Sequence, residues 1–122
     1  MREDVTVTDP LFQVSTTLDG DGDVTNLWLV GELDVDGTAT LRAALADCFA
    51  RGSDCVVLNL RGLRFCDCAG LNVLLEAKAT ADRIGSELCV EGARAQVARL
   101  LALTGADELF ADRVRRLPPR TL

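Results

Sequence analysis

Two cysteines and an aspartate stand together where the pattern of the chain changes, in the order Cys66-Asp67-Cys68. An apolar run that begins at Cys55 leads into them, and leucines with the spacing of a helix face follow, at Leu71, Leu74 and Leu75. Ile84, near the end of the same helical pattern, is expected to face inward with them. This pattern predicts a buried strand, a tight turn and the N-terminus of a helix. Helix N-termini present unpaired backbone N–H groups and the positive end of a dipole. The place therefore suits an anion, a covalent modification or a protein partner, and a capped helix with two incidental cysteines is the alternative.

The local chemistry of this stretch depends on Asp67 and Cys68. Aspartate is a preferred N-cap residue, and Gly70 is expected to permit the close approach of another chain. A helix N-terminus favours the thiolate, the reactive form of cysteine, whereas the carboxylate of Asp67 opposes it, so the balance stays open. Cys66 follows Phe65 at the end of the apolar run, and we expect its side chain to point into the core. Redox control through Cys68, with Cys66 as a resolving thiol, is one hypothesis, and simple packing is the other.

The remaining cysteines and the absence of histidine limit the chemistry further. The five cysteines are an odd number, which argues against a framework of disulfides. Cys48, Cys55 and Cys89 lie within apolar patterns and are predicted to be small core residues. The chain has no histidine, which removes Cys–His dyads, the commonest general base and mixed zinc sites. We therefore expect a protein that is not an enzyme, with no metal and no cofactor.

An acidic and glycine-rich segment, Asp19-Gly20-Asp21-Gly22-Asp23, superficially resembles a calcium loop. A loop of the EF-hand type that starts at Asp19 would need glycine at its sixth position and glutamate at its twelfth. Those positions hold Val24 and Val30. The segment is therefore interpreted as the turn of a β-hairpin.

Periodicity along the chain predicts a mixed α/β fold. Strands are expected over residues 11–18, 24–30, 55–60 and 88–90, and helices over 37–50, 68–84 and 93–103, with at most a short helix near 107–117. The resulting order is β-β-α-β-α-β-α, with a sheet of four to five strands covered by three to four helices. The first hairpin should be antiparallel and the later strands parallel. One domain over 11–117 is expected, with tails at 1–10 and 118–122.

Composition and charge limit the classes of partner. The 122 residues are 48% hydrophobic, enough for one sizeable core. A net charge of -6 argues against direct binding to DNA or RNA and suits a basic protein partner. No apolar run has the length of a membrane span, and the first residues have no signal-peptide character. We expect a cytoplasmic protein without membrane contact, present as a monomer or weak dimer.

Three motifs in sequence order resemble one known family. The stretch from Asn59 to Leu71 is similar to the signature of the STAS domain of bacterial anti-sigma factor antagonists, through Leu60, Phe65, Asp67, Gly70 and Leu71. A second motif is Gly31-Glu32-Leu33-Asp34, followed by Ala39, Leu41, Arg42 and Leu45. A third is Leu103-Thr104-Gly105, followed by Leu109-Phe110. The resemblance covers residues from about 11 to 110 and implies the same mixed sheet and helices.

The resemblance implies a function in partner switching. Antagonists of this family bind an anti-sigma factor that resembles a histidine-kinase-type ATPase domain, and so control sigma-factor-dependent transcription. Their phosphoacceptor serine corresponds to Cys68 here, and the next residue is Ala69. A thiol is not a substrate for a serine kinase, so the site should stay in its binding form or be switched by oxidation. The alternative is a STAS signalling module in another protein complex, redox-controlled through Cys68.

The resemblance also implies a partner surface around the start of the second helix. Its predicted members are Asp34, Asp67, Cys68, Ala69, Gly70 and Asn72. Asp34 has an equally weighted alternative as a cap or turn residue after the second strand. Asn59 replaces a common aspartate and is expected to remove a charge beside the site, while Arg61 and Arg64 are expected to add positive charge to a loop there.

Overall fold

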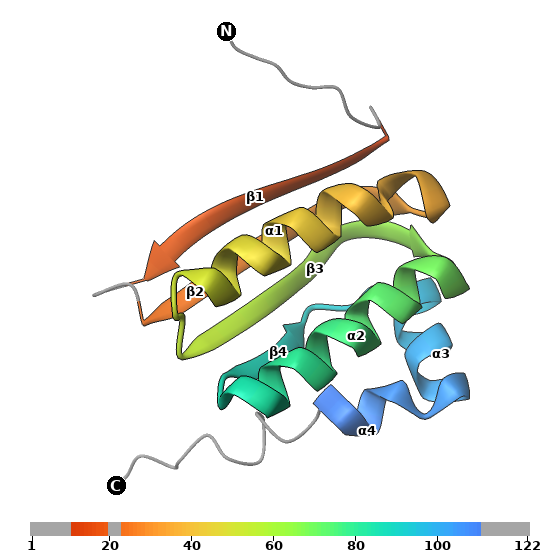
Figure 1. Cartoon of the computed structure of the whole chain (residues 1–122). Helices are drawn as coiled ribbons and strands as arrows, with labels where there is room; N and C mark the ends of the chain where they lie inside the picture. Colours follow the sequence, from red (N-terminus) through yellow and green to blue (C-terminus); the bar gives the residue numbers. More distant parts are fainter. Residues whose placement is uncertain (1–10, 20–22, 111–122) are drawn as a thin grey trace, which may run out of the picture.

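The computed structural model describes residues 11–19 and 23–110, and these form a mixed sheet with helices (Figure 1). The elements follow the order β1 (Phe12–Asp19), β2 (Val24–Leu33), α1 (Thr38–Ala50), β3 (Cys55–Cys66), α2 (Cys68–Ile84), β4 (Glu87–Glu91), α3 (Ala95–Thr104) and α4 (Ala106–Phe110). One 3-10 turn, Val35–Gly37, precedes α1. The predicted β-β-α-β-α-β-α order is confirmed. The short helix predicted near 107–117 corresponds to α4, which is described up to Phe110, the last described residue. The predicted tails at 1–10 and 118–122 lie outside the described residues.

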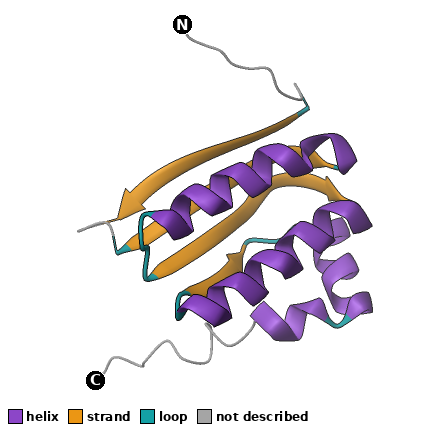
Figure 2. Ribbon diagram, viewed as in Figure 1, coloured by secondary structure: helices purple, strands orange, loops and turns teal. Residues whose placement is uncertain are grey.

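The sheet has the strand order β1-β2-β3-β4 (Figure 2). β1 pairs antiparallel with β2, and β2–β3 and β3–β4 are parallel, as the hairpin and the helical crossovers predict. Ser15 lies opposite Trp28 in the first pair, and Leu33 lies opposite Cys66 in the second. The carboxyl ends of β2 and β3 therefore meet at one end of the sheet.

The main core lies between the sheet and the helices α1 and α2, which run side by side over one face in Figure 1. The central strands supply leucines at alternate positions, and α1 and α2 supply Leu41, Leu45, Leu71 and Leu74. These helical positions repeat at three or four residues, which is why the two helices form with an apolar stripe. Helices α3 and α4 lie at the β4 end and add Val97, Leu101, Ala106 and Phe110 to the same core.

The opposite face of β3 carries a second, smaller cluster. Cys55, Val57 and Cys89 are buried there, with Val24 partly buried against them. Val56 and Leu58 alternate with them and belong to the main core. All four residues of the run Cys55-Val56-Val57-Leu58 are thus buried, as a central strand requires. The predicted burial of Cys48, Cys55 and Cys89 is confirmed.

Two local expectations are wrong. β3 was expected to end at Leu60 but continues to Cys66, because β2 is long enough to pair with it through Leu33. Register shifts between β2 and β3 accommodate this extra length. Ile84 was expected to face inward, but its exposed fraction is 51%, because it is the last residue of α2, where the helix ends at Gly85.

No helix within residues 11–19 and 23–110 has both the length and the apolar character that crossing a membrane requires. The same part of the chain holds no group of three or more histidine, cysteine, aspartate or glutamate side chains placed to bind a metal ion.

Candidate functional site

The candidate site lies where β3 passes directly into α2, with Asp67 as the single residue between them. The Asp67 backbone is extended, and its N–H donates to the Leu33 carbonyl of β2 at 3.1 Å. Its carboxylate accepts from the Gly70 N–H at 2.9 Å, and its carbonyl accepts from the Leu71 N–H at 2.9 Å. The predicted N-cap is confirmed, and these bonds fix the first turn of α2 against β2.

Gly70 brings α2 close to the sheet. The residue is buried, and a Cβ there would lie 2.6 Å from Leu33 Cγ and 3.0 Å from Cys66 Sγ. No side chain larger than hydrogen fits this space without movement of its neighbours. The expectation that Gly70 admits another chain is therefore wrong, because the glycine is used to pack α2 on β2 and β3.

Cys66 is buried beneath this turn. Its side chain has an exposed fraction of 1%, and its thiol donates to the Asp67 carbonyl at 3.4 Å. Burial raises the pKa of the Cys66 thiol to about 12, and the nearby Asp67 and Cys68 add to the shift. The thiolate is the form that attacks disulfides and oxidants, so a buried and protonated Cys66 is poorly suited to act as a resolving thiol.

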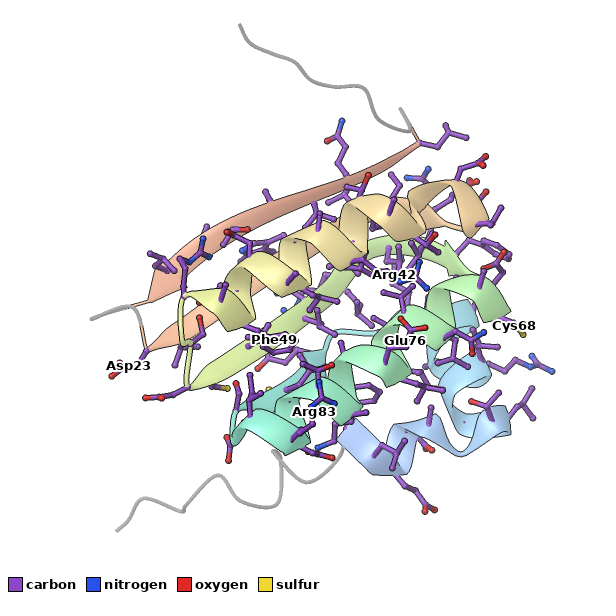
Figure 3. The ribbon with its side chains drawn as sticks, in the orientation of Figure 1. Asp23, Arg42, Phe49, Cys68, Glu76 and Arg83 are labelled. Atoms are coloured by element: carbon purple, nitrogen blue, oxygen red, sulfur yellow. The ribbon has the colours of Figure 1, made fainter. Side chains whose placement is uncertain are left out.

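Cys68 is the first residue of α2 and the exposed one among the five cysteines, all of which lie in the described ranges. Figure 3 shows its sulfur at the outer end of α2, pointing away from the molecule. Ala69 is half-buried, and Asn72 is exposed one turn along the helix. The structure therefore brings Asp67, Cys68, Ala69 and Asn72 together at the start of α2, as predicted.

Asp34 reaches the same end of the sheet from β2. It follows Leu33, as Asp67 follows Cys66, and those two preceding residues are register partners. The Asp34 carboxylate accepts from the Asp36 N–H at 3.0 Å and caps the 3-10 turn. Its role as a cap is confirmed. Asp34, Asp36 and Asp67 make this end of the molecule acidic, and Val35 is 67% exposed among them.

Gln96, which the sequence analysis did not single out, supports the end of β3 from the other side. Its Oε1 accepts from the Cys66 N–H at 2.9 Å, and its Nε2 donates to the Cys66 carbonyl at 3.0 Å. β4 ends opposite Asn59, so this part of β3 lacks a neighbouring strand on that side. One side-chain amide thus takes the place of a strand residue. A glutamine near a helix start carries no pattern that would reveal this role.

Replacing Gln96 by leucine should lower the free energy of unfolding by about 1–3 kcal/mol, because the N–H and carbonyl of Cys66 lose their partners. Gln96→Glu should lower the free energy of unfolding by less, because it keeps an acceptor for the Cys66 N–H. Urea denaturation of both variants checks this order. Equal losses would contradict a role for both hydrogen bonds.

Three residues that were expected to alter the site lie within β3 rather than in a loop beside the site. Asn59 is buried in β3, and its side chain accepts from the Arg61 N–H at 3.1 Å. The strand places it roughly 23 Å along β3 from Cys66, at about 3.3 Å per residue. The expected loss of charge beside the site is therefore wrong. Arg61 and Arg64 lie on β3 rather than on a loop. Arg61 Nη1 is 4.0 Å from Glu91 Oε1, and Arg64 Nη2 is 3.8 Å from Glu32 Oε2.

A shallow groove of about 260 Å³ runs between α1 and α2. The side chains of Arg42 and Glu76 form an ion pair across this groove (Figure 3). Arg42 Nε donates to Glu76 Oε1 at 3.1 Å, and Arg42 Nη2 donates to Glu76 Oε2 at 3.3 Å. Phe49 and Val73 lie in the lining of the groove. The second motif therefore contributes Arg42 to the contact between helices rather than to the surface around Cys68.

Comparison with known proteins identifies the family. The family model described as "Mlab, STAS domain" matches residues 16–115. The chain therefore belongs to the STAS domain family, as its three motifs predict. No curated protein sequence matches the chain.

Solved structures show the same fold. An anti-sigma factor antagonist from Mycobacterium paratuberculosis is 23% identical with a TM-score of 0.70, and the match covers 85% of this chain and 87% of that one. The Bacillus cell fate determinant SpoIIAA in its phosphorylated form is 16% identical with a TM-score of 0.63, over 88% and 99% of the two chains. Murine Slc26a9, an anion transporter, is 21% identical with a TM-score of 0.63, over 75% of this chain and 15% of the transporter.

Proposed function

We propose that this protein is an anti-sigma factor antagonist that binds an anti-sigma factor through the surface around Cys68. The observation that carries the proposal is the exposed Cys68 at the first position of α2, directly after the capping residue Asp67. In the STAS antagonists that the motif resembles, this is the place of the phosphoacceptor serine. The fold shared with an anti-sigma factor antagonist and with a phosphorylated SpoIIAA supports the same assignment.

The proposed surface consists of the capping residue Asp67, of Cys68, Ala69 and Asn72 on α2, and of Asp34 beside them. Binding here competes with a sigma factor for the anti-sigma factor, which releases the sigma factor for transcription. The acidic residues and the net charge of -6 favour a basic face on the partner. A partner of the kind implied by the family is a histidine-kinase-type ATPase domain.

The cysteine changes how the surface is regulated. A phosphate adds a charge of about -1.5 to -2 at neutral pH. Next to Asp67 and within the contact itself, the phosphate must lose its water on binding and is repelled by the neighbouring carboxylates, so it opposes the contact even where the surrounding face of the partner is basic. A neutral thiol resembles an unmodified serine in size and takes no phosphate from a serine kinase. The protein therefore stays in its binding form in the presence of kinase and ATP.

The test is a pair of substitutions at one position. Cys68→Ser should bind the anti-sigma factor within about twofold of the wild type, whereas Cys68→Asp should bind at least tenfold more weakly, a loss of about 1.4 kcal/mol. Isothermal titration against each purified anti-sigma factor of the source organism measures both. Ala79→Asp is the matched control, because it adds the same charge at an exposed position further along α2.

The same proteins test the modification. After incubation with a cognate anti-sigma kinase and ATP, mass spectrometry should find no phosphate on the wild type and a phosphate on Cys68→Ser at position 68. Equal affinities of Cys68→Ser and Cys68→Asp would place position 68 outside the interface. A stoichiometric phosphate elsewhere on the wild type would mean that the switch lies at another residue.

A second candidate function is a STAS module in a different protein complex, with oxidation of Cys68 as its input. The exposure of Cys68 and the occurrence of the fold within an anion transporter favour it. Two molecules of hydrogen peroxide convert a thiol to a sulfinic acid and release two molecules of water, which places a negative charge where the family carries phosphate. Binding to none of the anti-sigma factors, together with peroxide-dependent gain of two oxygen atoms at Cys68, would favour this candidate. Cys68→Ser is the control that lacks the modification.

A further inference from the structure

The two edges of the sheet are built differently. β4 is a short edge strand of five residues with Glu87 and Glu91 at its ends, and α4 packs against it. β1 is an edge strand of eight residues that pairs with β2 along its whole length without a register shift. It contains no proline, lysine or arginine, and its only charged residue is the last one, Asp19. Edge strands without such protection are templates for pairing with another strand.

The exposed side chains of β1 differ between its two faces. Phe12 and Val14 contact the core, so Thr16 and Leu18 project on the same face by alternation, and Leu18 is 59% exposed. Gln13, Ser15 and Thr17 project on the other face and are exposed. Thr17 Oγ1 accepts from Trp28 Nε1 at 3.0 Å, which orders that face.

We propose that β1 pairs antiparallel with β1 of a second copy of this chain, about a two-fold axis through Thr16. The two four-stranded sheets then form one continuous sheet, with the helices of both copies on the same face. In this register Thr16 lies opposite Thr16 of the second copy, Val14 lies opposite Leu18, and Ser15 lies opposite Thr17. Apolar side chains meet apolar ones, and hydroxyls meet hydroxyls.

The self-complementary pattern is the reason to choose a second copy as the occupant of this edge. A two-fold contact uses one patch twice, so the Val14–Leu18 and Ser15–Thr17 pairs are each made twice, and the Thr16 pair on the axis is made once. Strand β1 carries no charged residue except Asp19. The repulsion between two copies, each with a net charge of -6, therefore comes from charges away from the contact, and salt screens it. β1 is separated from β3 by β2, so pairing leaves the surface around Cys68 open.

Cysteine cross-linking tests the contact and its register together. In a Cys68→Ser background, Thr16→Cys places two cysteines opposite each other across the axis, where Cα atoms of paired strands are about 4.5–5.5 Å apart. That separation permits a disulfide. Gln13→Cys is the matched control on the same edge, because its two copies would be roughly 20 Å apart. Mild oxidation and non-reducing electrophoresis should show a covalent dimer for Thr16→Cys and at least tenfold less for Gln13→Cys.

Sedimentation equilibrium on the unmodified chain supplies an independent measurement. The wild type should dimerise in a concentration-dependent way, and Leu18→Glu should weaken the dimer at least tenfold. Leu103→Glu is the control, because Leu103 is an exposed leucine on α3, remote from β1. A monomer at every concentration, equal cross-linking at positions 13 and 16, or a dimer unaffected by Leu18→Glu would each overturn the proposal.

Discussion

Replacing Gly31 by alanine should lower the free energy of unfolding by about 3–5 kcal/mol, because strain and overlap act together. Gly31 has a φ of +108°, which side chains rarely adopt, and a Cβ there would lie 1.9 Å from the Leu11 carbonyl oxygen. That carbonyl accepts from the Glu32 N–H at 2.8 Å, so relief of the overlap must break the bond that holds the start of β1. Phe12, which is 1% exposed, would be drawn out of the core with it.

Urea denaturation measures this loss, and a melting temperature lowered by more than about 10 °C should accompany it. Gly52→Ala is the matched control. Gly52 has a φ of +78°, and a Cβ there would meet nothing within 4 Å. It should therefore show only the backbone cost of about 1–2 kcal/mol. Equal losses at the two glycines would show that the overlap with Leu11 is not decisive.

Gly70→Val should cost about 3 kcal/mol, although most helix interiors gain stability when glycine is replaced. The added side chain would occupy the space of Leu33, whose Cγ and Cδ2 lie 2.6 Å and 2.8 Å from the position of a Cβ. Because Gly70 also donates to the Asp67 carboxylate, displacement of α2 would disturb the cap beside Cys68. Asn72→Val is the control on the same turn, and it should change stability by less than about 0.5 kcal/mol because Asn72 is exposed.

A double variant separates packing from other causes of the Gly70→Val effect. Leu33→Ala removes the atoms that the valine would meet, so Gly70→Val should cost at least about 1 kcal/mol less in that background than in the wild type. Thermal and urea denaturation of the four proteins give this coupling. Additive losses would mean that Leu33 is not the neighbour that excludes a side chain at position 70.

Several features of the fold were predictable because they depend on neighbours along the chain. The N-cap role of Asp67 follows from a side-chain type that bonds the backbone three residues ahead. The run from Cys55 to Leu58 predicts a central strand, since four successive apolar residues cannot all be buried on one face. The β-β-α-β-α-β-α order, with an antiparallel hairpin followed by parallel strands, then follows from connection lengths. Assignment to the STAS family needed only the motifs and their order.

Other features depend on which residues meet across the fold, and these the sequence did not reveal. The length of β3 depends on its pairing with β2 as far as Leu33 and Cys66, and a pattern confined to β3 contains no information on that partner. Ile84 fits the helical period but lies beyond the reach of the core. A glycine at position 70 could allow close approach either of a partner protein or of the sheet. Only the position of Leu33 shows that the sheet lies against Gly70.

By itself, the sequence determined the family, the order of elements and the exposed chemistry at Cys68, because these follow from residue types and short-range periodicity. Tertiary structure decided what surrounds that cysteine. It buried Cys66 with a raised thiol pKa, placed Asp34 at the same end of the sheet, and supplied Gln96 as a substitute for a strand. Each of these depends on contacts between residues about 30 positions apart, which are set by packing and register rather than by local preference.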